Sequence, residues 1–438
     1  MRNRRGRSSS GLRGCVLLVV VALTAATATP AAAAAPRRRL ELGGRVHDDV
    51  VPLAVDGEQS RWRSGADVDE GGRELTVPTR MVVGWGLWPP VPQGPIVLLA
   101  DGGLIAGRIE AADDASVTVR SASLGRLVLP GGSVVGWRAG PSIGPGPLDS
   151  TTDAARDPTG TAARMLLDNG DELSARHMTW RDGRLDLAVR NGSVTVPERV
   201  VRAIDFGRPA SQREAAAPLP RILAALADGS WLEVESLHTG VTPGPAGLAA
   251  AEDARIALVT AAGLGPQAVE CFAADVVALA VDAGATTRLG TREPVAFMQA
   301  PLLAEQGRWP LTHGRTVTGG WPTLRGETAS TALGMHAPAT ARFAVPVPGG
   351  RFESRVGIDD TAGLGGSVVV RVRPAADAAP GRDAFVSPVL RGGERPLDVR
   401  VDLGSATAVE LVVEPADGGD VLDRVLWLDP RVVVPDGR

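Results

Sequence analysis

Apolar and polar residues alternate in short stretches along most of the chain, as in "SVTVRS" at 116–121 and "RLDLAVR" at 184–190. A period of two is typical of β-strands that bury one face and expose the other. Asp-Gly or Asn-Gly pairs stand between such stretches, at Asp101-Gly102, Asn169-Gly170 and Asp228-Gly229. These pairs supply the positive φ that tight hairpin turns need. The pattern therefore predicts short antiparallel strands joined by tight turns.

The alternating stretches form a loose repeat. One copy runs over 97–137 and a second over 165–204, and a third begins at 222–237 and closes, after an insertion, at 268–282. Residues 73–85 resemble the end of an earlier copy. Each copy reads as a strand, a turn, further strands and a Val-Val closing strand. We therefore expect small antiparallel β units, built as barrels or as paired sheets.

The last part of the chain has a denser strand pattern. "SVVVRVRP" at 367–374 and "AVELVVEP" at 408–415 are two of at least six predicted strands, with almost no helical pattern between them. Such spacing favours a β-sandwich, so we expect an all-β protein. We divide the chain into a leader at 1–35, a β-repeat region at 36–140, a β-repeat unit at 160–208, a β-repeat unit with an insertion at 219–285, and a sandwich domain at 290–438.

Three motifs follow one another in the sandwich domain: "LGMH" at 333–336, "VGIDD" at 356–360 and "DGGDVLD", which ends at Asp423. In this order they resemble the NPCBM domain, a family of carbohydrate-binding modules found beside glycoside hydrolases of family 98. The resemblance implies a jelly-roll sandwich, related to galactose-binding-like folds, that binds sugars without cleaving them. Some relatives hold a structural calcium. Relatives often have a histidine and an acid where this chain has Arg424 and Leu426.

The N-terminus has the three-part pattern of a secretory signal peptide. Five arginines precede an apolar run from Cys15 to Ala28, and an alanine-rich tract follows it. The pattern predicts cleavage between Ala28 and Ala35, and hence a secreted, periplasmic or cell-surface protein of bacterial type. An uncleaved membrane anchor is the alternative, although the apolar core is short for a bilayer span.

Charge and cysteine content narrow the function classes. All 46 basic residues are arginine, and without the leader the chain has 41 of them against 50 acids, a net charge of −9. An acidic protein is a poor candidate for binding nucleic acid. Cys271 is the one cysteine after the leader, so the mature chain has no internal disulfide. Its apolar surroundings in the sequence predict a buried structural thiol.

A sugar ring presents hydroxyls around an apolar C–H patch, so sugar-binding modules use polar side chains and aromatic faces. The candidate sugar contacts are His336, Trp309, Trp321, Arg424 and Trp427. A structural histidine bonded to the backbone is the alternative for His336. Core packing is the alternative for the tryptophans, above all for Trp427 within "VLWL".

The adjacent Asp359 and Asp360 follow a predicted strand and precede a glycine-rich bend. Neighbouring strand residues point to opposite faces, so the two carboxylates are a poor catalytic pair, and a turn role is favoured. A structural calcium site is the alternative, and it would need six to eight oxygens. The candidate ligands for it are Asp359, Asp360, Asp417, Asp420 and Asp423.

No motif of a known enzyme class stands out. The five histidines are scattered, and the sequence has no His-Glu-x-x-His, no Gly-x-Ser-x-Gly and no phosphate loop. We expect a secreted, non-catalytic protein that binds a glycan or polysaccharide, with the β repeats as a spacer or interaction platform. One alternative is a structural cell-envelope protein whose sandwich binds protein partners. Another is an accessory subunit of a glycoside hydrolase. No cofactor other than calcium is expected, and no membrane span after leader removal.

Overall fold

The computed structural model describes residues 39–64, 73–140, 163–206, 220–239, 254–260, 268–300, 309–376 and 381–434. Every regular element in these ranges is a β-strand or a short 3-10 turn, which confirms the predicted all-β class. None of the described residues forms a helix long and apolar enough to cross a membrane. The predicted leader lies outside the described residues.

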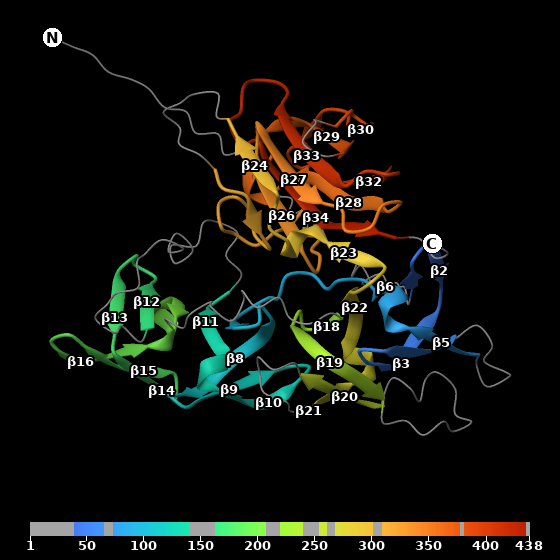
Figure 1. Cartoon of the computed structure of the whole chain (residues 1–438). Coiled ribbons are helices and arrows are strands. Elements are labelled where there is room, and N and C mark those ends of the chain that lie inside the picture. Colours follow the sequence, from blue (N-terminus) through green and yellow to red (C-terminus); the bar gives the residue numbers. More distant parts are fainter. Residues whose placement is uncertain are drawn as a thin grey trace, which may run out of the picture. The chain divides into compact units, whose positions relative to one another are not determined.

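The N-terminal part consists of four β repeats, which we number in chain order (Figure 1). The first has β1 (Leu40–Leu42), β2 (Arg45–His47), β3 (Val50–Val55), β4 (Gln59–Ser64), β5 (Glu74–Pro78) and β6 (Val82–Gly86). The second has β7 (Ile96–Leu99), β8 (Leu104–Ala112), β9 (Ser116–Ser121), β10 (Gly125–Pro130) and β11 (Val134–Arg138).

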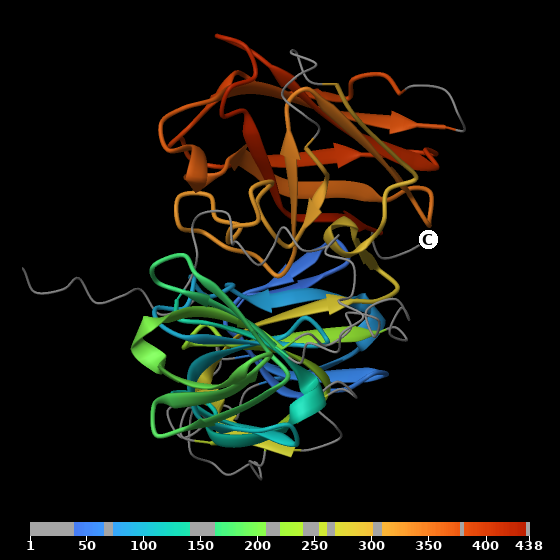
Figure 2. The same ribbon diagram turned by 90° about the vertical axis from the view of Figure 1, so that its left-hand side faces the viewer.

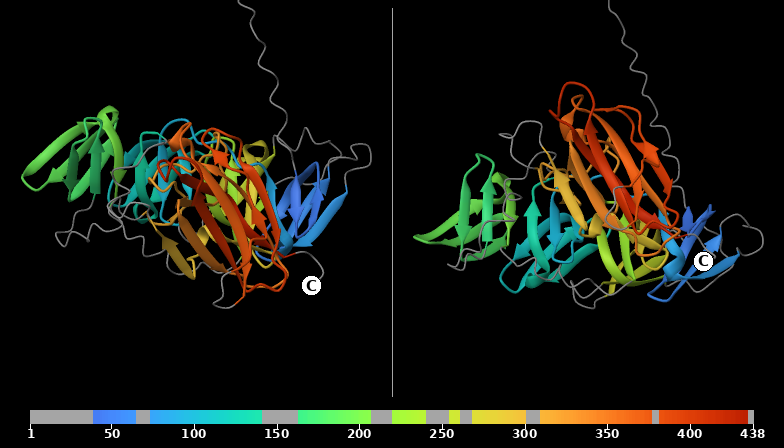
Figure 3. Two further views of the ribbon diagram at one scale, coloured as in Figure 1. Left: turned by 90° about the horizontal axis from the view of Figure 1, so that it is seen from above. Right: turned by 45° about the horizontal axis from the view of Figure 1, so that its top comes forward.

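The third repeat has β12 (Ala163–Leu167), β13 (Glu172–Ala175), β14 (His177–Arg181), β15 (Arg184–Val189), β16 (Gly192–Pro197) and β17 (Val201–Asp205). The fourth has β18 (Arg221–Leu226), β19 (Trp231–Thr239), β20 (Arg255–Thr260), β21 (Ala268–Phe272) and β22 (Val276–Asp282). The strands of the third repeat are green in Figure 3, and its strands β14 and β17 pair with β8 and β11 of the second repeat. In each repeat a three-residue 3-10 turn precedes the closing strand.

The turns predicted from Asp-Gly and Asn-Gly share one geometry in three repeats. Gly102, Gly170 and Gly229 have φ of 92°, 89° and 89°. The residue before each glycine accepts a backbone N–H two positions on, at 2.7 Å for Asp101, 3.0 Å for Asn169 and 2.9 Å for Asp228. The side chain therefore fixes the turn, and an amide oxygen serves as well as a carboxylate oxygen.

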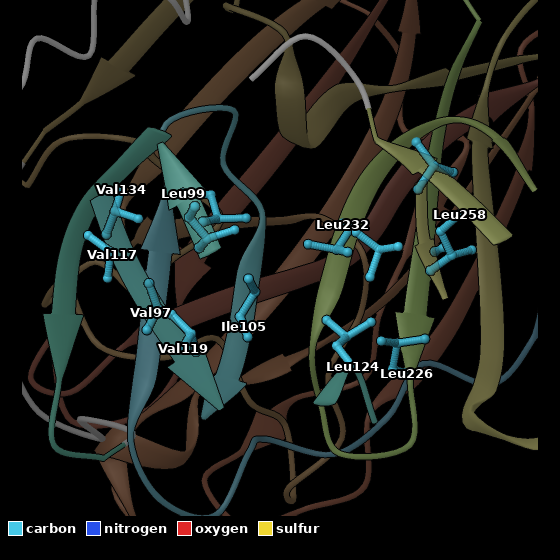
Figure 4. Close-up of a cluster of buried hydrophobic side chains, with 14 of the residues drawn as sticks. Val97, Leu99, Ile105, Val117, Val119, Leu124, Val134, Leu226, Leu232 and Leu258 are labelled. Atoms are coloured by element: carbon cyan, nitrogen blue, oxygen red, sulfur yellow. The ribbon is translucent and has the colours of Figure 1, made fainter. Parts of the chain in front are cut away.

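The repeats are joined through their closing strands. The closing strand β6 of the first repeat pairs with β22 of the fourth, and β11 of the second pairs with β17 of the third. Trp137 and Trp180 meet edge to face across the second and third repeats, with ring centroids 5.1 Å apart. In Figure 4, Leu124 of the second repeat lies beside Leu226 of the fourth. One hydrophobic cluster therefore runs through all four repeats.

The C-terminal part is a sandwich of two six-stranded antiparallel sheets (Figure 2). One sheet has the order β25-β26-β34-β28-β32 with β23 on β34, and the other β24-β27-β33-β29-β30 with β31 on β29. Their bounds are β23 (Thr286–Arg288), β24 (Ala296–Gln299), β25 (Thr312–His313), β26 (Ala332–His336), β27 (Ala339–Ala344), β28 (Arg351–Ile358), β29 (Ser367–Ala375), β30 (Phe385–Val386), β31 (Leu390–Arg391), β32 (Leu397–Asp402), β33 (Ala408–Pro415) and β34 (Arg424–Val433).

The inward faces of the two sheets form a separate core. Trp427 and Phe352 are fully buried in it and meet edge to face with ring centroids 6.0 Å apart. This confirms the core-packing alternative for Trp427 and removes it from the sugar-binding candidates, because a buried ring offers no face to a ligand. Cys271, in the core of the repeats, is also fully buried, and burial raises its thiol pKa to about 12, as a structural thiol requires.

Candidate functional site

A polar cluster lies where three neighbouring strands of the sandwich end. His336 is the last residue of β26 and stands opposite Arg424, the first residue of β34. Asp359 follows β28, and its N–H donates to the Arg424 carbonyl at 2.9 Å. Because β34 lies between β26 and β28, these three residues are side by side at one edge. The strand register therefore gathers residues that are far apart in the sequence.

Trp309 covers the histidine. The Trp309 and His336 rings are stacked, with centroids 5.0 Å apart and planes 6° from parallel. His336 is 6% exposed, and its Nδ1 lies 2.7 Å from the Ala337 carbonyl, which confirms a histidine bonded to the backbone. That contact requires the proton on Nδ1, so Nε2 is an acceptor. Burial lowers the His336 pKa, which favours the neutral ring.

Two buried carboxylates in the cluster each keep one oxygen without a hydrogen-bond partner. Asp359 Oδ1 accepts the N–H of Thr361 at 2.8 Å and its hydroxyl, while Asp423 Oδ1 accepts the N–H of Ser367 at 2.7 Å. The Oδ2 atoms of Asp359 and Asp423 are buried and unpartnered. Burial raises the pKa of both acids, and that of Asp423 reaches about 6, with nearby Asp420 adding to the shift.

Arg424 supplies the matching donor. Its Nη1 lies 3.3 Å from the Thr361 hydroxyl oxygen, and its Nε is buried without a partner. A buried polar atom without a partner costs about 1–3 kcal/mol, so such atoms are uncommon unless a ligand or water meets them. The cluster thus contains two buried acceptors and one buried donor without a partner, next to the half-buried ring of Trp309. A sugar hydroxyl both donates and accepts, so this arrangement fits a sugar.

Two other candidate residues are Asp360, which adjoins Asp359, and Trp321. Asp359 caps the 3-10 turn that begins at Asp360, and Asp360 accepts the N–H groups of Arg325 at 2.6 Å and Gly326 at 2.9 Å. The predicted turn role of both aspartates is confirmed. Half-buried Trp321 lies two residues before Thr323, whose carbonyl accepts the Asp360 N–H at 3.1 Å.

Of the predicted calcium ligands, Asp359 and Asp423 lie in the polar cluster, and Asp420 lies near Asp423. Asp417 is exposed and pairs with Arg391 at 2.6 Å, and Asp360 is occupied by backbone N–H groups. Nowhere in the described ranges do three or more acids, histidines or cysteines form a group that could hold a metal ion. The calcium hypothesis stays a prediction.

Two residues of the cluster were not predicted from the sequence. Thr361 bonds to Asp359, and Ser367 bonds to Asp423. Thr361 stands two residues after Asp359, the usual spacing for a hydroxyl and N–H that satisfy one carboxylate. That local spacing could have identified it. Ser367 donates its N–H to Asp423 from a strand distant in sequence, and no local pattern indicates that contact.

The sandwich matches a protein-family model. Residues 297–433 match the family model described as the NPCBM/NEW2 domain, which bears out the resemblance of the three motifs. This is a family of carbohydrate-binding modules rather than of catalytic domains. No curated protein matches the chain at a significant level.

Several solved structures are similar to part of the chain. One is the CBM51 of Clostridium perfringens GH95 in complex with methyl-galactose, at 17% identity and a TM-score of 0.28, covering 34% of this chain and 99% of that one. Another is CBM51-2 with GlcNAc from Clostridium perfringens ZmpB, at 17% identity and a TM-score of 0.30, covering 45% and 40%. Tandem CBM51 modules of a Streptococcus pneumoniae family 98 glycoside hydrolase match at 13% identity and a TM-score of 0.26, covering 62% and 88%.

Proposed function

We propose that this protein is a secreted, non-catalytic carbohydrate-binding protein whose sugar site is the cluster of Trp309, His336, Asp359, Asp423 and Arg424. The observation that carries the proposal is the set of unpartnered buried atoms, the Oδ2 of Asp359 and Asp423 and the Nε of Arg424. The family match of residues 297–433 supports the same ligand class. The four repeats then serve as a spacer or an interaction platform, with a glycan or polysaccharide as the partner.

Binding of the full chain to a glycan array, followed by calorimetry on the best ligand, tests the proposal. Trp309→Ala removes the aromatic face, and we expect it to weaken binding about five- to thirtyfold, since one aromatic contact contributes about 1–2 kcal/mol. Asp423→Asn keeps the Oδ1 acceptor for Ser367 and replaces the free oxygen, so it should weaken binding without unfolding the domain.

Asp417→Asn is the matched control, because Asp417 is exposed in the same loop as Asp423 and pairs only with Arg391 among its described side-chain contacts. It should bind like the parent protein. If no sugar binds at millimolar concentration, or if all three variants bind equally well, the proposed site is wrong.

A second candidate function is binding of a protein partner in the cell envelope. Leu364 is 90% exposed and Val421 is 67% exposed, and both lie on the loops that carry Asp359 and Asp423. Exposed aliphatic side chains around a polar site are common in protein interfaces. In a pull-down from envelope extract, a partner whose capture is lost in Leu364→Asp and is unaffected by competing sugar would favour this function over the lectin.

A further inference from the structure

Two kinds of strand pairing join the four repeats to one another. The closing strand β6 of the first repeat pairs with β22 of the fourth, and β11 of the second pairs with β17 of the third. The fourth and second repeats meet differently, at the start of β19 and the start of β8, where Trp231 stands opposite Leu104. The described pairings therefore give the order first, fourth, second, third, with the first and third repeats at the ends.

The contact between the fourth and second repeats joins two equivalent positions. Leu104 and Trp231 each follow the turn glycine of their repeat by two residues. Each side chain points away from the core of its repeat, because the next residue, Ile105 or Leu232, is a core residue. Leu104 is nevertheless only 1% exposed, because it lies at the junction with the fourth repeat. Two equivalent surfaces thus face each other, as in the isologous interface of a two-fold dimer.

A hydrogen bond beside this bridge shows how the flanking residues meet. The N–H of Ala106 donates to the Ser230 hydroxyl at 2.9 Å. Ser230 precedes Trp231 by one residue, and Ala106 follows Leu104 by two. Two repeats joined in this way therefore bring the residue before the bridging position of one repeat to the residue two after that position in the other.

The two end repeats have the same position without a repeat opposite it. Val46 of the first repeat and Glu172 of the third also follow their turn glycines by two residues, and their hairpin registers match those of Leu104 and Trp231. In the described pairings, β2 bonds only to β1 and β13 only to β12. Val46 is 42% exposed, and the Glu172 side chain is 45% exposed. Both ends of the series are therefore open to solvent at this position.

The two ends differ in their chemistry. The first repeat has the aliphatic Val46 at the bridging position, with Arg45 before it and Asp48 two residues after it, and all three are exposed. If two first repeats met as the fourth and second do, Arg45 of each copy would meet Asp48 of the other. Opposite charges would then face each other twice across the two-fold axis. In the third repeat, Glu172 would stand opposite a second Glu172, and like charges directly opposite are destabilising.

We propose that a second copy of this chain binds to the first repeat, so that the protein forms a symmetric dimer with Val46 of one copy opposite Val46 of the other. The contact between the fourth and second repeats is continued from one chain to the next, and the Arg45–Asp48 pairs between the copies add charge complementarity. The charged face of the third repeat ends the series, as the polar outer faces of terminal repeats do. The assembly therefore closes as a dimer.

The contact between chains should be weaker than the one within a chain. Linked repeats meet at a high effective concentration, whereas two chains meet at their actual concentration. A dimer carries two sandwich domains, so it can engage one polysaccharide at two points with greater avidity. That consequence rests on the function proposed above. The dimer itself uses no residue of the sandwich cluster, so the two proposals can fail separately.

Sedimentation equilibrium of the full chain over a range of protein concentrations tests the dimer. We expect a monomer–dimer equilibrium whose association constant falls about tenfold or more in Val46→Asp, since two aliphatic contacts are replaced by charges. Arg45→Glu should also weaken association, because it places two acids together. Arg45→Glu combined with Asp48→Arg should restore association, which a variant that weakens association by misfolding would not do.

Cysteine cross-linking tests the position of the two-fold axis. In a Cys15→Ser background, buried Cys271 is the only native thiol left. Val46→Cys should form an intermolecular disulfide in a glutathione redox buffer, because opposite residues of an antiparallel pair lie within disulfide reach. Glu172→Cys is the matched control at the same position of the third repeat. It should cross-link roughly tenfold more slowly or less, because two such residues meet only in random collisions.

Three results would overturn the proposal. The first is a full chain that stays monomeric up to its solubility limit. The second is an association constant that Val46→Asp leaves unchanged, which would place the contact on another surface. The third is equally fast cross-linking of the two cysteine variants. Unchanged circular dichroism and melting temperature would show that the variants fold.

Discussion

Two carboxylates, buried Asp423 just before strand β34 and half-buried Asp429 in its middle, lie in opposite environments. Before the strand, Asp423 has one free oxygen, and burial raises its pKa to about 6. Farther along, burial also raises the pKa of Asp429, but Arg288 and Arg431 outweigh it and lower that pKa to about 2. Asp429 is therefore fully paired within the fold, whereas Asp423 has room for a ligand. The contrast teaches that a buried carboxylate indicates a binding site only where one of its oxygens has no hydrogen-bond partner.

The largest expected effect comes from removing the ion pair between Arg288 and Asp429. Arg288 is 2% exposed and contacts Asp429, so Arg288→Leu leaves a carboxylate with fewer partners. Removing one partner of a buried ion pair costs about 3–5 kcal/mol. We expect the free energy of unfolding of the sandwich to fall by that amount in urea titrations followed by tryptophan fluorescence. A loss below about 1 kcal/mol would mean that Arg431 alone satisfies Asp429.

The stability contributed by Asp423 should fall as pH rises, because burial raises the pKa of this carboxyl. Because the pKa of Asp423 in the folded protein is about 6, above its ordinary value of 3.8, its contribution to stability is complete below pH 3.8 and is lost as pH rises through 6. This difference in pKa corresponds to about 3 kcal/mol. Asp423→Asn removes this dependence, so the parent protein should lose stability relative to the variant between pH 4 and pH 7. Parallel pH profiles of the two proteins would contradict the shift.

Ligand affinity should also depend on the ionisation of Asp423. A sugar hydroxyl that donates to Oδ2 favours the ionised carboxylate, so binding should strengthen several-fold as pH rises from 5 to 7. Calorimetry at several pH values measures the change, and Asp423→Asn should flatten the profile. A profile that stays steep in the variant would place the titrating group elsewhere in the site.

The sequence predicts a structural feature when that feature depends on residues close together in the chain, and it does not when the feature depends on the pairing of distant strands. The turns at Asp101, Asn169 and Asp359 follow from residues two positions apart, and the structure confirms them. The strand class follows from alternation in the same way. The meeting of His336 with Arg424 depends on the β26–β34 register, which no local pattern fixes. For the same reason, the pairing of the first repeat with the fourth could not be predicted.

The smallest expected effect concerns an ion pair at the surface of the same domain. Arg391 and Asp417 lie 2.6 Å apart with side chains 52% and 64% exposed, so water screens the pair. Such pairs contribute about 0–1 kcal/mol, because the side chains lose freedom for little electrostatic gain. A double-mutant cycle with Arg391→Ala and Asp417→Ala should give a coupling energy in that range, and it should fall further in 1 M salt. A coupling energy as large as the loss of stability in Arg288→Leu would contradict this prediction. It would show that an exposed ion pair can stabilise the domain as much as the pair of Arg288 with Asp429.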